Sequence, residues 1–418
     1  MKPSHVEVAV IGGGQAGLSI SWYLKKAGIE HVVFERHRVV NEWRSARWDS
    51  FCLVTPNWQC RLPGFPYDGV EPDGFMLRDD IVSYLDRYVA SFEPPLMEHT
   101  HVKRLRKLPG GHFEIDTSAG TWHANQVVIA TGGYQIPTVP RSAERLPDSI
   151  LQLHSSNYRN PASLPAGEVL VVGTGQSGCQ IAEDLHREGR KVHLAVGTAP
   201  RAPRRYRGRE VTDWLTESGY YAIPIDKHPQ GEAVRDKTNH YLSGRDGGKE
   251  IDLRQFALEG MRLYGRMKDI AGSTMQFEPD LRRNLDSADA SYLNIRAAVD
   301  RYIAEAGIDA PLEPAYTPVW QPDVDPTELD VTASNITSVI WSIGFGVDYR
   351  WAELPLFDGR GHPVHKRGIS VMPGVYFLGL PWQNTWGSGR FADVGLDAQF
   401  LIDRIAARVA QPATTLAA

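Results

Sequence analysis

Cysteine is scarce in this sequence, and no two cysteines stand at the spacing of a redox or metal motif. Only three occur in 418 residues, Cys52, Cys60 and Cys179, so neither a disulfide framework nor a CxxC dithiol is present. Enzymes that reduce disulfides through a vicinal dithiol are therefore not expected. We expect three buried, inert thiols. His99 and His101 lack further ligands at metal-binding spacing, so we predict no metal site.

Long apolar runs and an excess of one charge are also missing. No apolar run approaches the roughly 20 residues that a membrane span requires, and the N-terminus leads into a strand pattern without a signal peptide. The formal net charge of -5 gives no reason to expect a nucleic-acid or membrane partner. The length fits about two to three domains. We therefore expect a globular cytoplasmic protein.

Glycine is concentrated in a motif near the N-terminus. An apolar run is followed by a glycine turn, a helical pattern and a second apolar run that ends on Glu35. The turn residues are Gly12, Gly14, Gln15, Ala16 and Gly17. In a dinucleotide-binding βαβ unit the first glycine allows the tight turn, the second lets the backbone approach a pyrophosphate, and the third lets helix pack on strand. The acid then binds a ribose hydroxyl, and the phosphates lie at the helix N-terminus. A plain strand-to-helix turn is the alternative, but strand, helix and acid in register favour the nucleotide site.

The stretch 169–196 repeats this strand, glycine turn and helix. Its turn residues are Gly173, Gly175, Gln176, Ser177 and Gly178. An internal repeat favours two nucleotide sites over two coincidental turns. Val196 stands where the first copy has Glu35, so no carboxylate would repel a 2′-phosphate, and Arg201, Arg204 and Arg205 follow as candidates to bind one. The first site therefore suits FAD and the second NADPH, with a solvated basic loop as the alternative for the arginines.

The pattern predicts an α/β fold with two dinucleotide-binding (Rossmann-like) domains, the NADPH domain being inserted in a discontinuous FAD domain. We predict the first part of the FAD-binding domain over 1–150, the NADPH-binding domain over 151–330 with a helical insertion at about 208–311, a return to the FAD-binding domain over 331–410, and a disordered tail over 411–418. Helices are predicted over 78–90, 252–267, 289–306 and 394–409, and strands over 101–105, 112–116, 121–123, 126–130, 339–344 and 374–380.

Several segments between these elements are candidates for ligand contact. The segment 36–66 predicts an ordered loop over something large and flat, and 231–248 a flexible connection. Ala130, Thr131 and Gly132 end a buried strand with small residues that permit a close backbone approach to a ligand. The helix that begins near 394 could point its positive end at a flavin. Candidates for an aromatic pocket are Trp214, Tyr220, Tyr221, Trp382 and Trp386, although aromatic residues are more often core.

With both glycine turns placed, the chain resembles the class B flavoprotein monooxygenases over nearly its whole length. It is similar to the flavin-containing monooxygenases and to bacterial relatives of the plant indole-pyruvate monooxygenases. The matching residues are both turns, Glu35 with Arg36, Trp43 with Arg44, Ala130 to Gly132 with Pro137 and Pro140, His154 to Tyr158, and Gly395 to Ala398.

The resemblance implies an NADPH- and FAD-dependent monooxygenase. A C4a-hydroperoxyflavin would transfer one oxygen atom of O2 to a nitrogen, sulfur or carbonyl-bearing small molecule. The resemblance implies Thr55 and Asn57 as catalytic residues, with Asn57 near flavin N5, although Pro56 separates a pair that is often adjacent in the family. It also implies that Val102 contacts the adenine. Trp43 and Gln59 would lie near the isoalloxazine.

Tyr158 stands where Baeyer–Villiger relatives carry tryptophan, which makes that chemistry less expected. A homodimer is left open. Two rival functions remain: an NADPH-dependent flavoprotein reductase without oxygen insertion, and a non-catalytic redox-sensing flavoprotein.

Overall fold

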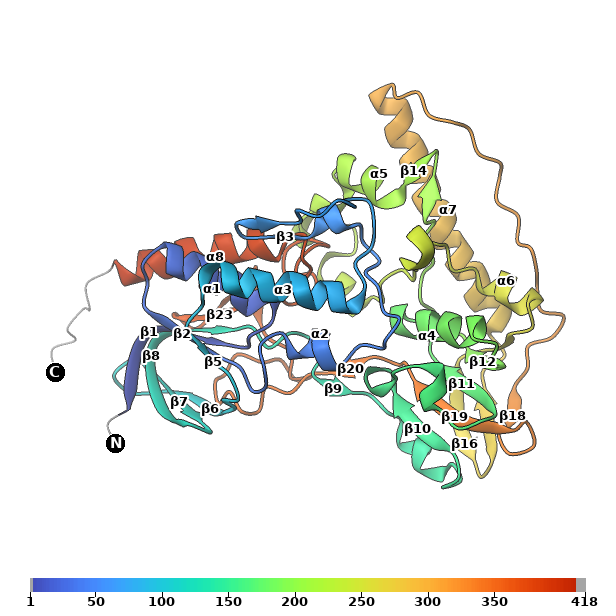
Figure 1. Ribbon diagram of the computed structural model, residues 1–418, viewed down its shortest axis with the longest axis horizontal. Helices are drawn as coiled ribbons and strands as arrows, with labels where there is room; N and C mark the ends of the chain where they lie inside the picture. The colour runs from blue at the N-terminus through green and yellow to red at the C-terminus, as the bar shows by residue number, and fades with distance from the viewer. Residues whose placement is uncertain (1–2, 411–418) are drawn as a thin grey trace.

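The computed structural model describes residues 3–410, and within them the chain folds around two main sheets at opposite ends of the molecule (Figure 1). The N-terminal and C-terminal parts of the chain build the first sheet, and the middle part builds the second. Both consist mainly of parallel strands connected by helices, which confirms the predicted α/β fold with two dinucleotide-binding units. The predicted tail, 411–418, lies outside the described residues.

The first sheet runs in the order β21-β22-β23-β8-β1-β2-β5, and β7 adds β6 beside β8. The strands are β1 (Ser4–Ile11), β2 (His31–Phe34), β5 (Leu96–Met97), β6 (Val102–Lys107), β7 (Phe113–Thr117), β8 (Gly120–Ile129), β21 (His365–Lys366), β22 (Ile369–Ser370) and β23 (Val375–Phe377). Strand β1 lies between β2 and β8, both parallel to it, so its apolar run is buried on both faces. The predicted strands 121–123 and 126–130 form one continuous strand, β8.

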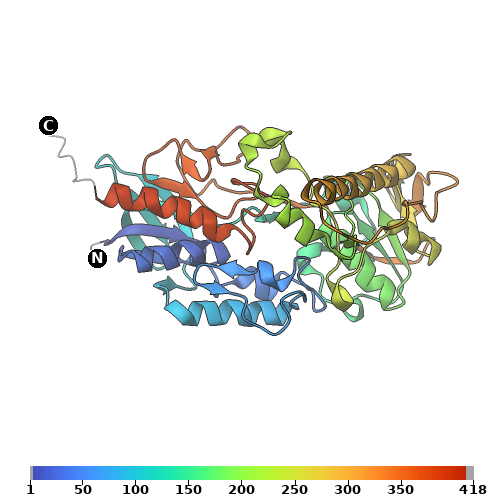
Figure 2. The ribbon, with the colours of Figure 1, turned by 90° about the horizontal axis from the view of Figure 1, so that it is seen from above.

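Helices cover one face of the first sheet. Helices α1 (Gln15–Lys26), α3 (Arg78–Phe92) and α8 (Val394–Val409) lie side by side, as the view from above shows (Figure 2). Their inward residues, such as Leu18 and Leu401, form one core with the sheet. The β6–β7 hairpin and the segment 347–357 pack on the opposite face. A short helix, α2 (Asn41–Ser45), and a small hairpin of β3 (Arg61–Leu62) and β4 (Phe65–Pro66) lie in the predicted loop 36–66.

The second sheet is parallel throughout, in the order β10-β19-β11-β12-β15. Its strands are β10 (Leu151–His154), β11 (Glu168–Val172), β12 (Val192–Ala195), β15 (Arg262–Tyr264) and β19 (Ile336–Trp341). The helices of this part are α4 (Gln176–Arg187), α5 (Val211–Glu217), α6 (Leu253–Leu258) and α7 (Leu281–Ala306). Helices α4, α6 and α7 pack on one face, and a three-stranded sheet of β16 (Met267–Ala271), β17 (Thr274–Phe277) and β18 (Glu328–Asp330) packs on the other.

The structure corrects the predicted elements of the middle region. The predicted helix 252–267 is only α6, after which the chain enters strand β15, because Leu263 and Tyr264 are buried beside β12. Helix α7 begins at Leu281, two turns earlier than predicted, through a polar stretch. Strand β19 pairs with β10 and β11, so the strand predicted to return to the first sheet completes the second one instead. The segment 231–248, predicted as a flexible connection, contains short 3-10 helices at 231–236 and 245–247.

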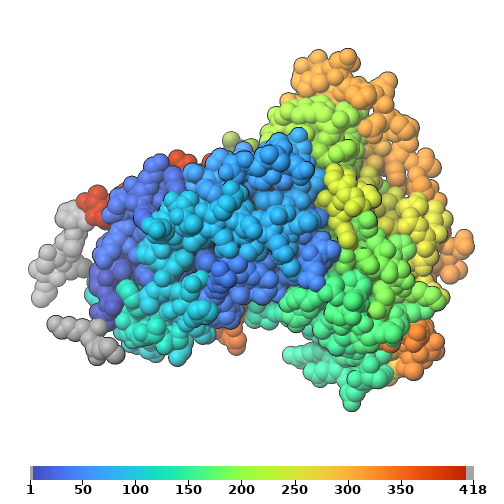
Figure 3. Space-filling view, viewed as in Figure 1, coloured from blue at the N-terminus to red at the C-terminus, as the bar shows by residue number. Residues whose placement is uncertain are grey.

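The chain crosses between the two sheets twice, and the two crossings run side by side. Strand β9 (Ile136–Pro137) on the way out pairs antiparallel with β20 (Phe345–Gly346) on the way back. Another small hairpin, β13 (Arg205–Tyr206) with β14 (Arg209–Glu210), leads into α5. In the space-filling view the N-terminal segments form one lobe and the middle segments another (Figure 3).

Candidate functional site

A cavity of about 2900 Å³ lies between the two sheets and reaches both glycine turns. Ligand pockets usually measure about 300–1,000 Å³, so this cavity has room for several small molecules at once. The predicted site residues that line it are Gly12, Gly14, Gln15, Ala16, Glu35, Arg36, Trp43, Thr55, Gln59, Val102, Ala130, Thr131, Gly132, Gly173, Gly175, Gln176 and Ser177.

The three glycines of the first turn are needed for three different reasons. At Gly12, where φ is +111°, a Cβ atom would lie 2.5 Å from the Ala130 carbonyl oxygen of the neighbouring strand. At Gly17 a Cβ atom would lie 1.8 Å from the Gly12 carbonyl oxygen, so only glycine lets α1 pack so close to β1. At Gly14 no atom of the described residues lies within 4 Å of the Cβ position. The middle glycine therefore faces open cavity, where a ligand could approach the N-terminus of α1.

The second turn repeats this geometry. At Gly173, where φ is +103°, a Cβ atom would lie 2.6 Å from the Ser342 carbonyl oxygen, and at Gly178 one would lie 1.9 Å from the Gly173 carbonyl oxygen. At Gly175 the nearest atom is Cγ2 of Thr238, at an ordinary contact distance of 3.6 Å. The corresponding glycines of the two turns thus have similar surroundings, and the N-terminus of α4 is open to the cavity.

Glu35 lies at the end of β2, beside the first turn. One carboxylate oxygen accepts a hydrogen bond from the Gly13 backbone N–H at 2.8 Å, and the other accepts one from the His37 N–H, also at 2.8 Å. These bonds fix the carboxylate at the cavity wall, where Arg36 and Val102 lie as well. At the second turn the corresponding Val196 is 2% exposed.

Gln15 connects two walls of the cavity near the first turn. Its Nε2 donates a hydrogen bond to the Gly389 carbonyl oxygen at 3.0 Å, and its Oε1 accepts one from the Trp43 indole at 3.0 Å. Trp43 in turn stacks on Phe391, with ring centroids 5.2 Å apart. Gln59 is 3% exposed, and its Oε1 has no hydrogen-bond partner among the described residues. A ligand atom in this part of the cavity could supply the missing donor.

The second glycine turn is held in place by the chain that follows it. Nε2 of Gln176 donates to the Leu242 carbonyl oxygen at 2.6 Å, and Oγ1 of Thr174 accepts from the Gly197 backbone N–H at 3.0 Å. At the end of β8, Oγ1 of Thr131 accepts a hydrogen bond from Nε2 of Gln135 at 3.1 Å. Hydrogen bonds therefore hold the cavity wall both at the second glycine turn and at the end of β8.

The structure does not bring Asn57 to the cavity. Its Nδ2 donates to the Glu71 carbonyl oxygen at 3.0 Å, and its Oδ1 accepts from the Met76 backbone N–H at 2.7 Å. The side chain is 2% exposed and both of its polar ends serve the loop 71–76. The predicted position near flavin N5 is therefore corrected to a structural one. Of the two residues predicted as catalytic, Thr55 alone lines the cavity.

Arg44 and Gly395 are also absent from the cavity wall. Arg44 forms an ion pair with Asp86 and donates to the Val39 carbonyl oxygen at 3.2 Å, so it ties α2 to α3. A Cβ atom at Gly395 would lie 3.2 Å from the ring of Pro63, so this glycine lets α8 pack on the 36–66 segment. Phe391 and Ala392, just before α8, line the cavity in its place.

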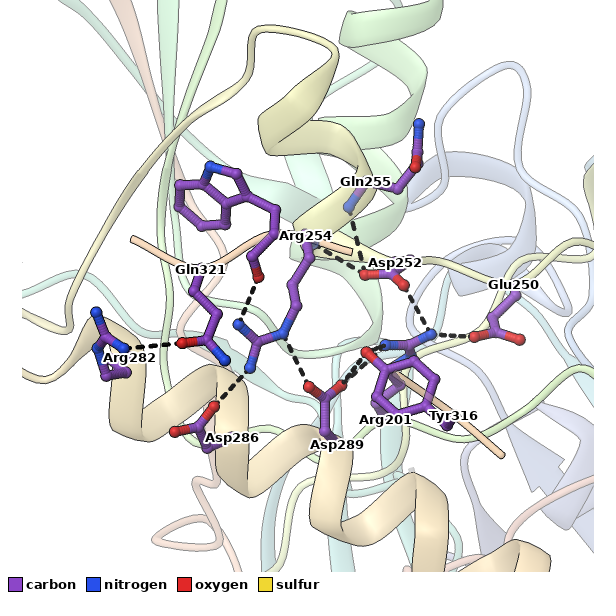
Figure 4. Close-up of polar contacts among 11 residues, drawn as sticks. Arg201, Glu250, Asp252, Arg254, Gln255, Arg282, Asp286, Asp289, Tyr316 and Gln321 are labelled. Atoms are coloured by element: carbon purple, nitrogen blue, oxygen red, sulfur yellow. Dashed lines mark hydrogen bonds and ion pairs between the residues drawn. The ribbon is translucent and has the colours of Figure 1, made fainter. Parts of the chain in front are cut away.

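The arginines predicted to bind a 2′-phosphate are turned away from the second turn. Arg201 is 3% exposed and pairs with Glu250, Asp252 and Asp289, the last two at 2.9 Å (Figure 4). Burial alone would lower the pKa of Arg201, but Asp252 and Glu250 outweigh it and raise the pKa above its ordinary value. Arg254 shares Asp289 at 2.8 Å and donates to the Trp320 carbonyl oxygen, which fastens the extended segment 308–325 to α7.

The other two arginines are likewise engaged. Arg204 is 3% exposed, pairs with Glu210 at 2.7 Å and lies 4.0 Å from the ring centroid of Phe75. Arg205 pairs with the same Glu210 at 2.9 Å and is mostly exposed. None of the three lines the cavity. The predicted phosphate role is thus not supported, because carboxylates already pair with these arginines, Glu210 with Arg204 and Arg205 and three distant acids with Arg201.

Four of the five aromatic candidates line the cavity, namely Tyr220, Tyr221, Trp382 and Trp386. Trp214 does not, since it is 1% exposed in the core between α5 and α7 and donates its indole N–H to the Tyr206 carbonyl oxygen at 2.8 Å.

Cavity residues that the sequence did not indicate include Arg47, Tyr134 and Arg390, and the wall formed by 228–240. Each arginine lies on a tryptophan ring, at 5.0 Å from Trp43 for Arg47 and at 4.1 Å from Trp386 for Arg390. The only signal in the sequence is that both arginines stand four residues from the tryptophan that they cover.

The three thiols are buried and free. Burial raises the pKa of Cys52 to about 11 and that of Cys60 to about 12, and it also raises the pKa of Cys179. Thiols of this kind remain protonated and unreactive at neutral pH. Within residues 3–410 no group of three or more His, Cys, Asp or Glu side chains is arranged to hold a metal ion, and no helix is long and apolar enough to cross a membrane.

Comparison with known proteins places the chain. A family model described as pyridine nucleotide-disulphide oxidoreductase matches residues 9–218. An uncharacterized CzcO-like oxidoreductase of Geobacillus kaustophilus is 34% identical over 404 residues, which cover 96% of this chain and 98% of the relative. The indole-3-pyruvate monooxygenase YUCCA4 of Oryza sativa subsp. japonica is 28% identical over 206 residues, which cover 45% of this chain and 46% of the relative.

A solved structure has the same fold. The flavin-containing monooxygenase from Stenotrophomonas maltophilia superposes with a TM-score of 0.66 at 19% identity, over 97% of this chain and 100% of that one. The predicted resemblance to flavoprotein monooxygenases is thereby confirmed, as are the predicted oxidoreductase class and the FAD- and NADP-binding type of fold. From the family model and the Geobacillus relative, the chain belongs to the pyridine nucleotide-disulphide oxidoreductase family.

Proposed function

We propose that this protein is an NADPH- and FAD-dependent monooxygenase that transfers one oxygen atom of O2 to a small molecule. The observation that carries the proposal is that two glycine turns of the same geometry, one in each sheet, open into one cavity. Two dinucleotides bound at these turns would extend toward each other through that cavity. A protein that holds both a flavin and a nicotinamide in contact needs this arrangement.

The residues present fit an FAD at the first turn. Gly14 leaves space for the pyrophosphate, and Glu35 is held where a ribose hydroxyl would lie. Val102 is on the wall near Glu35, as an adenine contact would require. Gln59 carries a buried oxygen without a hydrogen-bond partner in residues 3–410, which could accept a hydrogen bond from the flavin ring. Gln15 and Trp43 would hold the wall beside it.

At the second turn the residues fit a nicotinamide dinucleotide. Gly175 leaves space for the pyrophosphate, and Ser177 and Gln176 line the same wall. Arg201 and its neighbours are engaged elsewhere, so they do not favour NADPH over NADH. The remaining support for NADPH is Val196, which offers no carboxylate to repel a 2′-phosphate.

The flavin, when bound, would supply the electron transfer between NADPH and dioxygen. The overall reaction consumes NADPH, a proton, O2 and substrate, and yields NADP+, water and the oxygenated substrate. The part of the protein is to bind the reactants, orient them and keep water out. The aromatic side chains of Tyr221, Trp382 and Trp386 on the cavity wall serve the last purpose.

A second candidate function is a flavoprotein reductase that passes electrons to an external acceptor. The description of the family model favours it, since it names disulphide oxidoreductases. The buried thiols argue against disulfide reduction through the cysteines of this protein, because their raised pKa values leave them protonated. Reduction of an acceptor without protein thiols is the form of this alternative that an experiment has to separate.

Oxygen uptake measured against NADPH consumption separates the two functions. We expect purified protein to be yellow and to consume NADPH and O2 in equal amounts when amines, sulfides or oxo acids are screened. With 18O2 the product should gain one labelled oxygen atom. Rapid mixing of the reduced enzyme with O2 should give a transient absorbing species before oxidised flavin returns. Substrate-dependent NADPH consumption with no label in any product would favour the reductase and overturn the proposal.

A further inference from the structure

Arg390 is a cavity residue whose charge has no ion-pair partner among residues 3–410. Its Nη2 donates to Oδ1 of Asn239 at 2.7 Å, and its Nη1 donates to the Trp386 carbonyl oxygen. Neither acceptor is charged, and no carboxylate among residues 3–410 forms an ion pair with this guanidinium. Asp393 is the carboxylate that acts on it through space, but Asp393 itself pairs with Arg61. Burial lowers the pKa of Arg390, yet arginine stays charged in proteins.

Arg201 provides a contrast within the same protein. Arg201, which is buried away from the cavity, is surrounded by three carboxylates. A charged group that leaves water without a counter-charge is costly, so buried guanidinium groups are normally paired. Arg390 is half-buried and faces the cavity instead. Its missing counter-charge is therefore expected on a ligand.

The surroundings of Arg390 favour a flat organic ligand. Its guanidinium carbon lies 4.1 Å from the centroid of the Trp386 ring, and the Tyr221 ring stacks on Trp386 at 3.9 Å with planes 19° apart. Arg390 and Tyr221 thus both pack on Trp386. Tyr220 and Trp382 line the same wall. The Arg390 guanidinium group therefore lies beside aromatic rings, an arrangement that suits an acid with an apolar or aromatic body.

The phosphates of the two cofactors have other sites. Each pyrophosphate would lie at a helix N-terminus, next to Gly14 for α1 and next to Gly175 for α4. Arg390 instead bonds to Asn239 and Trp386, in the wall that the segment 228–240 shares with the loop before α8. Trp382 and Trp386 line this part of the cavity. It offers a place for a third molecule beside the two cofactors.

We propose that Arg390 binds the carboxylate of a substrate that is a small acid with an aromatic or apolar body. The guanidinium would form two parallel hydrogen bonds to the carboxylate, while Trp386 and Tyr221 flank the apolar body. Arg47, a second cavity arginine without an ion pair among residues 3–410, adds positive potential on the Trp43 side. The description of this acid as a substrate rests on the proposed function, whereas its binding does not.

The test measures binding to the flavin-loaded protein with a matched pair of probes, 3-phenylpropionate and its neutral amide. Binding is followed by the change in the flavin absorption spectrum and by calorimetry, without NADPH, so no turnover is needed. We expect the acid to bind about 10- to 100-fold more tightly than the amide. In Arg390→Gln the acid should lose that advantage while the amide is unaffected, and Arg390→Lys should restore part of it.

The controls separate a substrate site from a cofactor site. Arg404 is exposed and also lies over an aromatic ring, at 4.9 Å from Phe400, but outside the cavity, so Arg404→Gln should leave both affinities unchanged. Flavin content and the Kd for NADP+ should be the same in Arg390→Gln as in the wild type. A Kd for NADP+ that rises as much as that for the acid would assign Arg390 to the cofactor and overturn the proposal.

The wild-type protein alone also decides the matter if Arg390→Gln does not fold. Equal affinity for acid and amide in the wild type would overturn the proposal. If the acid binds selectively but no substrate ever receives oxygen, then the proposed function fails and the acid site survives. If oxygen is inserted into neutral compounds and acids do not bind, the proposed function survives and the acid site fails.

Discussion

The middle glycine of each turn offers the most direct test of the site, because the structure separates its folding role from its binding role. Gly14 has φ -83° and ψ -174°, which alanine can adopt, and no atom lies within 4 Å of its Cβ position. Gly14→Ala should therefore change the free energy of unfolding by no more than about 1 kcal/mol. Gly17→Ala, by contrast, would place Cβ 1.8 Å from the Gly12 carbonyl oxygen and should be strongly destabilised.

The binding cost of Gly14→Ala follows from the same geometry. The new methyl group would project into the space where a pyrophosphate meets the free N–H groups of α1. A charge-assisted hydrogen bond contributes about 1.5–3 kcal/mol, and each 1.4 kcal/mol is a factor of ten in Kd. Loss of one such bond should weaken FAD binding about 10- to 100-fold.

The matched variant is Gly175→Ala, whose Cβ would make only an ordinary contact with Thr238. It should retain full FAD content and lose affinity for NADPH by a similar factor. The assays are the flavin released per chain on denaturation, titration of apoprotein with FAD, and the NADPH dependence of flavin reduction, with urea unfolding as the control for folding.

Two results would refute this reasoning. If Gly14→Ala is as stable as the wild type and binds FAD equally tightly, the pyrophosphate does not lie at the first turn. If Gly14→Ala instead loses NADPH and Gly175→Ala loses FAD, the assignment of the two cofactors is reversed.

Three further predictions concern residues whose roles the structure changed or revealed. Asn57→Ala removes the hydrogen-bond partners of the Met76 N–H and the Glu71 carbonyl, so it should lower the free energy of unfolding by about 1–3 kcal/mol in urea titrations. The oxygenation rate per bound flavin should be retained. A large loss of that rate in folded, flavin-loaded enzyme would restore the catalytic role of Asn57. Arg201→Gln leaves buried carboxylates without their cation and should lower the free energy of unfolding by about 3–5 kcal/mol. The ratio of kcat/KM for NADPH to that for NADH should not change. A fall in kcat/KM for NADPH alone would show that Arg201 binds the 2′-phosphate after all. Burial raises the pKa of Asp397 to about 6, above the value of about 3.9 for an unfolded chain, so the folded state binds the proton more tightly and stability falls as the pH rises from about 4 to about 6. Asp397→Asn removes this loss and should gain up to about 3 kcal/mol over the wild type at pH 8 but little at pH 4, and a gain independent of pH would contradict the assignment.

What the sequence predicted well is what short stretches determine by themselves. Each glycine turn, with its strand and helix, lies within about 30 residues, the length of one βαβ unit, and the roles of Gly12, Gly14 and Gly17 follow from local geometry. Helix α8 begins and ends where its apolar spacing predicted. The α/β fold follows from the repeat, because each such unit contributes parallel strands connected by a helix.

What the sequence could not predict depends on partners far along the chain. Arg201 is engaged by carboxylates 49 and 88 positions away, at Glu250 and Asp289, and nothing near Arg201 indicates them. Asn57 is used by the loop 71–76, which has no regular pattern of its own. Strand β15 has an apolar spacing that fits a helix equally well, and only its pairing with β12 decides the outcome.

The pairing of β9 with β20 means that the second domain departs from the first and rejoins it at a single point. Strands β8 and β23, on either side of this excursion, are themselves neighbours in the first sheet. Viewed from that sheet, some two hundred residues therefore amount to an elaborate loop between adjacent strands. Such connectivity makes the second domain an insertion, which evolution or a protein engineer can exchange without changing the strand order of the first sheet.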